Sequence, residues 1–191
     1  MICYLVRHGQ DDPTVRGGWS MASLTDEGQK QVANLAGYIS ANKDELRIER
    51  LFSSDLPRAV ETATPISTAL NIKIELTPQF RETNNGLLAG VPNDIASREY
   101  PGLFWSALDW DEPYPEGESP REFYQRVECA WESFSQQITQ QNKNVMLVTH
   151  QGVISVLCSI VSGTTYSNKA KMKPIEHTAI IPLRYCGKWK T

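Results

Sequence analysis

Two apolar strands that end in the same way constrain the fold of this chain most. Residues 2–6 and 145–148 are short apolar runs, and a continuous apolar run is typical of a strand buried on both faces. A histidine follows each run, His8 and His150, and a glycine comes one or two residues later. In open α/β sheets, ligands bind outside the carboxyl ends of the strands. If the two strands are neighbours, the two histidines face each other across one pocket.

The rest of the chain alternates between predicted helices and strands. Hydrophobic spacing predicts helices over 25–41, 57–70, 95–110, 120–138 and 153–161, and strands over 47–52, 72–76, 178–183 and, as a closing edge, 185–189. Pro65 should kink or interrupt the second helix. This order predicts a three-layer α/β/α sandwich with a largely parallel central sheet. We expect one domain over residues 1–191, with a small insertion over the active site at about 91–118.

Composition narrows the class of protein. Hydrophobic residues make up 40% and charged residues 21% of the chain, as in soluble globular proteins. The net charge of −3 gives no general attraction to nucleic acid or to an anionic membrane. The N-terminal apolar run is too short for a signal segment or a membrane span. Four cysteines lie far apart, which indicates free thiols and a cytoplasmic location. A homodimer is compatible with the sequence, which leaves the oligomeric state open.

The pair Arg7 and His8 is an unusual end for a buried strand. Two cationic side chains lose hydration there unless an anion lies opposite them, and Gly9 lets a ligand approach the backbone closely. A solvated surface turn would explain this trio equally well if it stood alone. Asp11 and Asp12 suggest a metal site with His8, but their spacing does not fit one, and a solvated loop is the preferred interpretation. We therefore predict no metal and no cofactor.

Six segments resemble, in the same order, the motifs of the histidine phosphatase superfamily, the phosphoglycerate mutase-like proteins. They are the Arg-His-Gly run at 5–9, a helix start at 24–28, a second arginine motif at 53–63, an acidic motif at 81–90, and two further motifs at 115–119 and 148–152. A lone Arg-His-Gly is weakly specific, whereas the series is strongly specific. The resemblance covers most of the chain and implies an enzyme that acts on phosphate esters.

The resemblance also implies a role for each central residue. His8 would be the nucleophile that attacks the phosphate ester in line and becomes a phosphohistidine. Arg7 and Arg58 would clamp the phosphoryl group, and His150 would donate a hydrogen bond to its oxygens. Glu82 would protonate the leaving alkoxide. The chemistry agrees, because arginines disfavour imidazolium and neutralise the charge of the transferring group.

Further residues complete the predicted site. The substrate-binding set adds Gln10, Thr14 and Gln151, and Thr14 replaces an asparagine that is common in the family. Glu82 has a second interpretation, because a surface ion pair with Arg81 would look the same. His177 stands where asparagine is frequent. Four aromatic residues of the insertion either line a substrate pocket or pack the insertion: Phe104, Trp105, Trp110 and Tyr114.

We predict a phosphatase whose partner is a small-molecule phosphate ester, with no nucleic acid and no membrane. A phosphoglycerate mutase-type enzyme is the alternative, but a mutase must exclude water from its phosphohistidine. The resembling mutases carry extra segments over the site, and this chain has only a modest insertion between Glu82 and Ser119. A second alternative is a phosphate-binding or phosphohistidine-signalling protein with little turnover. Glu82 argues against it, because a binding protein needs no proton donor.

Overall fold

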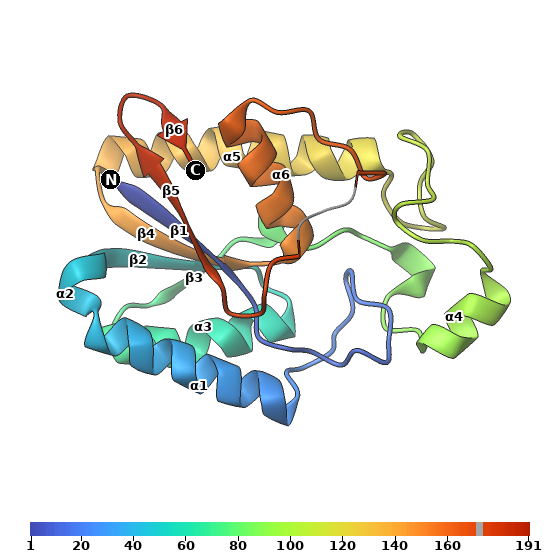
Figure 1. Ribbon diagram of the computed structural model, residues 1–191, viewed down its shortest axis with the longest axis horizontal. Helices are drawn as coiled ribbons and strands as arrows, with labels where there is room; N and C mark the ends of the chain where they lie inside the picture. Colours follow the sequence, from blue (N-terminus) through green and yellow to red (C-terminus); the bar gives the residue numbers. More distant parts are fainter. Residues whose placement is uncertain (171–173) are drawn as a thin grey trace.

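A six-stranded sheet forms the centre of the computed structural model, which describes residues 1–170 and 174–191 (Figure 1). Its strands lie in the order β3-β2-β4-β1-β5-β6. Their bounds are β1 Ile2–Arg7, β2 Ile48–Ser53, β3 Ile74–Leu76, β4 Asn144–Thr149, β5 Ile180–Tyr185 and β6 Trp189–Lys190. Strands β3, β2, β4 and β1 run parallel to one another, whereas β5 is antiparallel to both β1 and β6. The predicted largely parallel sheet is confirmed.

Helices cover both faces of the sheet, as Figure 1 shows. Helices α1 (Asp26–Ala41) and α3 (Pro57–Leu70) pack together on one face, and α5 (Pro120–Gln141) and α6 (Gln151–Ser162) on the other. Side chains of β4 point alternately into the two apolar layers: Val145 and Leu147 into one, Met146 and Val148 into the other. This alternation explains why β4 is apolar at every position, and it confirms the predicted three-layer architecture.

The central pair of strands brings the two histidines together. Strands β1 and β4 are parallel neighbours, and Arg7 lies opposite Thr149 at their carboxyl ends. His8 and His150 follow directly, and their ring centroids are 5.1 Å apart. The expectation that the two strands are neighbours and bring their strand-end histidines together is therefore confirmed.

Local capping signals fix the helix starts as expected. The Thr25 side chain accepts a hydrogen bond from the backbone N–H of Gly28, and Ser119 and Glu122 form a reciprocal capping box at the start of α5. The expected interruption at Pro65 was wrong, because α3 runs unbroken to Leu70. Buried Ala63 and Ile66 pack on the sheet on either side of Pro65, and this packing holds the helix together.

The insertion differs from its prediction. Instead of one helix over 95–110, a short α4 (Asn93–Glu99) ends before Pro101 and Gly102, where Gly102 has a φ of 78°. A proline and a left-handed glycine cannot continue a helix, so the aromatic residues that follow lie in turns. The short helix α2 (Lys43–Leu46) and the 3-10 turns Pro78–Phe80 and Gly86–Leu88 were not predicted as helical.

Two other sequence expectations bear on the class of protein. All four cysteines are free, and Cys3 is buried, which raises the pKa of its thiol. Within residues 1–170 and 174–191, no helix combines the length and the apolar character needed to cross a membrane.

Candidate active site

His8 lies directly after β1 and is only 5% exposed. Its Nδ1 is 2.7 Å from the carbonyl oxygen of Gly9. Because a carbonyl only accepts hydrogen bonds, Nδ1 carries the proton and the lone pair is on Nε2. Burial and the nearby Arg58 hold the pKa of His8 well below its usual value, so the imidazole is neutral at pH 7. A neutral ring with an unprotonated Nε2, which accepts a hydrogen bond from Arg58 Nε, is chemically equipped to act as a nucleophile.

Arg58 comes from the first turn of α3 and is only 1% exposed. Its two terminal nitrogens donate to backbone carbonyls, Nη2 to Gly18 (2.7 Å) and Nη1 to Ser20 (3.1 Å). Its Nε is 3.3 Å from His8 Nε2. The two terminal nitrogens of Arg58, which we expected to bind the phosphoryl group, are therefore already bound to the backbone. The terminal nitrogens fix the loop at 18–20, and Nε faces the nucleophile.

Asp11 lies beside Arg58, with its Oδ2 3.3 Å from Arg58 Nε, and its side chain is 18% exposed. The solvated loop expected for both aspartates is wrong for Asp11. Its backbone forms a β-bridge with Leu24, and its carboxylate meets the guanidinium. The expectation holds for Asp12, which is exposed and accepts hydrogen bonds from both the N–H and the hydroxyl of Thr14. Thr14 is exposed as well, and its hydroxyl group donates a hydrogen bond to the carboxylate of Asp12.

Arg7 is partly buried at the end of β1. Its Nη1 donates to the carbonyl of Ile175, and its Nε is buried without a partner among the described residues. Burial lowers the pKa of Arg7, with the carboxylates of Glu82 and Asp11 acting in the opposite direction. Arg7 therefore brings a second guanidinium to the carboxyl ends of the central strands, and its Nε is available to an anion.

His150 is fully buried and occupies the N-cap position of α6. Its Nε2 lies 2.8 Å from the hydroxyl of Ser54, and its Nδ1 has no partner among the described residues. Burial and Arg58 hold its pKa well below the usual value. When Ser54 donates its hydroxyl proton to Nε2, the Nδ1–H is free for a phosphoryl oxygen. Sequence reasoning missed Ser54, although the polar pair Ser53-Ser54 at the end of an apolar strand was a usable signal.

Glu82 is held by two backbone N–H groups. Its Oε1 accepts from Thr83 and its Oε2 from Gly152 in the first turn of α6, each at 3.0 Å. The alternative surface pair with Arg81 is not formed, because Arg81 binds Asp55 instead. A side chain at position 152 would place its Cβ 2.3 Å from Glu82 Oε1, so glycine there makes room for the carboxylate.

Glu82 and Gln151 line one cavity of about 590 Å³. Three of the four aromatic residues of the insertion also line it, namely Phe104, Trp105 and Tyr114. The fourth, Trp110, packs against Tyr124 and Tyr166. Packing of the insertion therefore holds for Trp110, and a substrate pocket lined by the other three stays a prediction.

The side chain of Gln10, a predicted substrate-binding residue, is bound within the protein. Its side-chain oxygen accepts a hydrogen bond of 2.9 Å from the hydroxyl of Thr25, and its backbone N–H donates to Gln31. Because Thr25 is the N-cap of α1, Gln10 joins the loop after His8 to the start of that helix.

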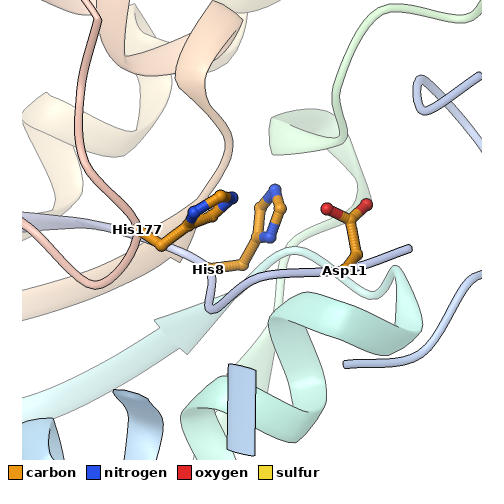
Figure 2. A group of neighbouring side chains, drawn as sticks. All are labelled: His8, Asp11 and His177. Atoms are coloured by element: carbon orange, nitrogen blue, oxygen red, sulfur yellow. The ribbon is translucent and has the colours of Figure 1, made fainter. Parts of the chain in front are cut away.

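A group of three side chains resembles a metal site (Figure 2). His177 and Asp11 lie on either side of His8, and one ligand atom from each of the three lies within 4.8 Å of the others. Two histidines and a carboxylate can bind transition metals. However, Arg58 Nε lies 3.3 Å from both His8 Nε2 and Asp11 Oδ2, and burial, together with Arg7, lowers the pKa of His177. Two guanidinium groups repel a cation and attract an anion, so the absence of a metal remains our prediction.

Comparisons with known proteins identify the family of the chain. The sequence model of the histidine phosphatase superfamily (branch 1) matches residues 3–190. "Probable phosphoglycerate mutase GpmB" of Escherichia coli (strain K12 / DH10B) is 32% identical over 165 residues, which are 84% of this chain and 74% of that protein. The α-ribazole phosphatase of Shigella flexneri is 26% identical, with a TM-score of 0.72, over 86% of this chain and 81% of the other.

A mycobacterial glucosyl-3-phosphoglycerate phosphatase, in a structure with VO3, has a TM-score of 0.79 and covers 99% of this chain and 96% of the other. At 22% identity this similarity concerns the fold. The similar proteins of higher identity are thus an α-ribazole phosphatase and a probable phosphoglycerate mutase. Together with the match over residues 3–190, they show that the chain belongs to the histidine phosphatase superfamily.

Proposed function

We propose that the protein is a phosphatase that hydrolyses a small phosphorylated metabolite through a phosphohistidine on His8. The observation that carries this proposal is the state of His8. The ring is neutral, its Nδ1 proton is held by Gly9, and its Nε2 lone pair faces the buried Arg58 beside His150. This arrangement suits attack on a phosphorus atom whose oxygens the cationic groups neutralise.

The reaction has two balanced steps. In the first, His8 Nε2 forms a bond to phosphorus while the ester P–O bond breaks, and protonated Glu82 gives its proton to the leaving alkoxide. In the second, Glu82 removes a proton from water, the water oxygen attacks the phosphohistidine, and inorganic phosphate leaves a neutral His8. Arg7 Nε, Arg58 Nε and the Nδ1–H of His150 bind the phosphoryl oxygens. Glu82 lines a cavity together with Gln151, the residue after His150, and we assign the leaving alcohol to this cavity.

The test is phosphate release from 4-nitrophenyl phosphate and from alkyl phosphates. Wild-type protein should release phosphate, and His8→Ala should release none. Rapid quenching into alkali, which preserves phosphohistidine, should show one added phosphoryl group on the wild-type protein. No turnover of any ester by folded wild-type protein would contradict the proposal and favour a phosphate-binding protein.

A mutase is the second candidate, and the 32% identity to GpmB favours it. Against it, Phe104 on the cavity wall is 45% exposed, so the cavity meets solvent where a mutase needs to exclude water. Incubation with 3-phosphoglycerate separates the two candidates. A mutase moves the phosphoryl group between positions, whereas a phosphatase releases it. We further propose a cytoplasmic setting, which the four free thiols support.

A further inference from the structure

The cavity to which we assign the leaving alcohol is lined by a cationic side chain, Arg16, that has no role in the proposed mechanism. Among the lining residues that the structure describes, Arg16 is the one arginine or lysine and Glu82 the one carboxylic acid. Burial raises the pKa of the third titratable lining residue, Tyr114, to about 12, so its phenol stays neutral. Glu82 is bound by two backbone N–H groups. Arg16 forms no salt bridge within residues 1–170 and 174–191.

The surroundings hold Arg16 in place. Its backbone N–H donates to Val91 (2.8 Å), and its carbonyl accepts from Gly90 (2.9 Å), which ties residue 16 to the insertion. Its guanidinium carbon lies 4.4 Å from the centre of the Phe104 ring. Stacking of this kind fixes the plane of the guanidinium and leaves its edge free. Arg16 is therefore oriented before any ligand arrives.

The Nε of Arg16 is buried and has no hydrogen-bond partner among the described residues. A buried donor without a partner costs free energy, and more so when it belongs to a charged group. An oxyanion in the cavity would remove this cost. The planar edge of a guanidinium fits the two oxygens of a carboxylate or phosphate.

We propose that Arg16 forms a second oxyanion subsite, which binds a carboxylate or phosphate group on the leaving alcohol of the substrate. The inference rests on the proposed function, because Glu82 in the same cavity marks the place of the alcohol. It narrows the substrate class to phosphate monoesters that carry a second anionic group. Sequence reasoning did not single out Arg16, because an arginine in a polar loop is ordinarily solvated.

The test compares matched esters of increasing length. One series is phosphoglycolate, 3-phosphonooxypropionate and 4-phosphonooxybutyrate, and the other is ethyl, propyl and butyl phosphate. For at least one length, wild-type kcat/KM should be about 10- to 100-fold higher for the carboxylate, as for a hydrogen-bonded charge pair. A third arm, 1,3-propanediol bisphosphate against propyl phosphate, shows whether a second phosphate is preferred over a carboxylate.

Two variants assign the preference to Arg16. In Arg16→Gln, the ratio between carboxylate and neutral ester should fall to about one. Arg98→Gln removes the same charge from an exposed side chain of α4 and should keep the wild-type ratio. Because the measured quantity is a ratio of two kcat/KM values, a general loss of activity lowers both values equally and leaves the ratio unchanged.

The outcomes separate this inference from the proposed function. Turnover of both ester series at equal rates, or a preference that persists in Arg16→Gln, would overturn the subsite and leave the phosphatase standing. If no ester is hydrolysed, calorimetry on the wild-type protein still compares 3-phosphonooxypropionate with propyl phosphate. Equal affinities there would overturn the subsite as well, whereas tighter binding of the carboxylate that Arg16→Gln abolishes would support it.

Discussion

Replacing Asp11 by asparagine should strengthen the binding of inorganic phosphate. Asp11 Oδ2 and His8 Nε2 both lie 3.3 Å from Arg58 Nε, the nitrogen that faces the site. A phosphoryl oxygen that binds this nitrogen must displace the carboxylate. The structure therefore shows a protein carboxylate in a position that the substrate needs, and its removal should favour the substrate.

The size of the effect follows from this contact. Asp11 and Arg58 form an ion pair, which phosphate binding must break when Asp11 is displaced. We take the range for a hydrogen bond to a charged group, about 1.5–3 kcal/mol net, as the scale of this loss. Repulsion between Asp11 and the bound anion adds to this cost. Two unit charges 4 Å apart interact by roughly 4 kcal/mol at an effective dielectric constant of 20, and rotation of the carboxylate toward solvent lowers that figure. We expect Asp11→Asn to lower the Kd of phosphate roughly 10- to 100-fold, at 1.4 kcal/mol for each factor of ten.

Isothermal titration calorimetry with inorganic phosphate at pH 7.5 and low ionic strength measures this Kd. Asp12→Asn is the matched control, because the adjacent Asp12 is exposed and bonds to Thr14. It removes the same charge from the same loop without touching Arg58. The reasoning fails if Asp11→Asn changes the Kd less than twofold, or if Asp12→Asn changes it equally.

Three further predictions concern the acid, the buried histidines and metal ions. Glu82→Gln should lower kcat for alkyl phosphates by about 10²–10⁴-fold but affect 4-nitrophenyl phosphate much less, because nitrophenolate leaves without a proton. Gly152→Ala should reproduce this pattern, since its Cβ displaces the carboxylate, and an equal loss on both esters would argue against an acid role. His8 and His150 have lowered pKa values when folded, so the unfolded chain takes up their protons first as the pH falls. The contribution of the two histidines to the free energy of unfolding is therefore fully present above the unfolded pKa near 6.5 and is lost below it, by up to about 1.4 kcal/mol per histidine and pH unit. Urea unfolding at pH 7.5 and 5.5 should show a smaller decrease in this free energy for His150→Gln than for the wild type. An unchanged decrease would contradict the assignment. Dialysis against EDTA should leave turnover unchanged, and a loss that Zn²⁺ or Mg²⁺ restores would refute the predicted absence of a metal.

Sequence pattern was sufficient where the cause is local. The apolar run of β4 and the stripes of α1 and α5 depend on residues close in the chain, and so do the caps at Thr25 and Ser119. The helix predicted over 95–110 was wrong although its cause is also local, because Pro101 and Gly102 end the helix. At Pro65 the opposite occurred, since packing on the sheet kept α3 continuous despite a local breaker.

The sequence by itself determined the layered α/β architecture, the strand-end histidines and, through the series of motifs, the family. Tertiary structure decided how these groups meet. It paired His150 with Ser54, turned Asp11 toward Arg58, and used the terminal nitrogens of Arg58 to hold the loop at 18–20. It also buried the Nε of Arg16 without a hydrogen-bond partner in the part of the chain that the structure describes. The physical reason is that hydrophobic periodicity and capping act over a few residues and are written in the local sequence. The charge and hydrogen-bond partners of a buried polar group come from segments far apart in the chain, and their positions exist only after the sheet has formed.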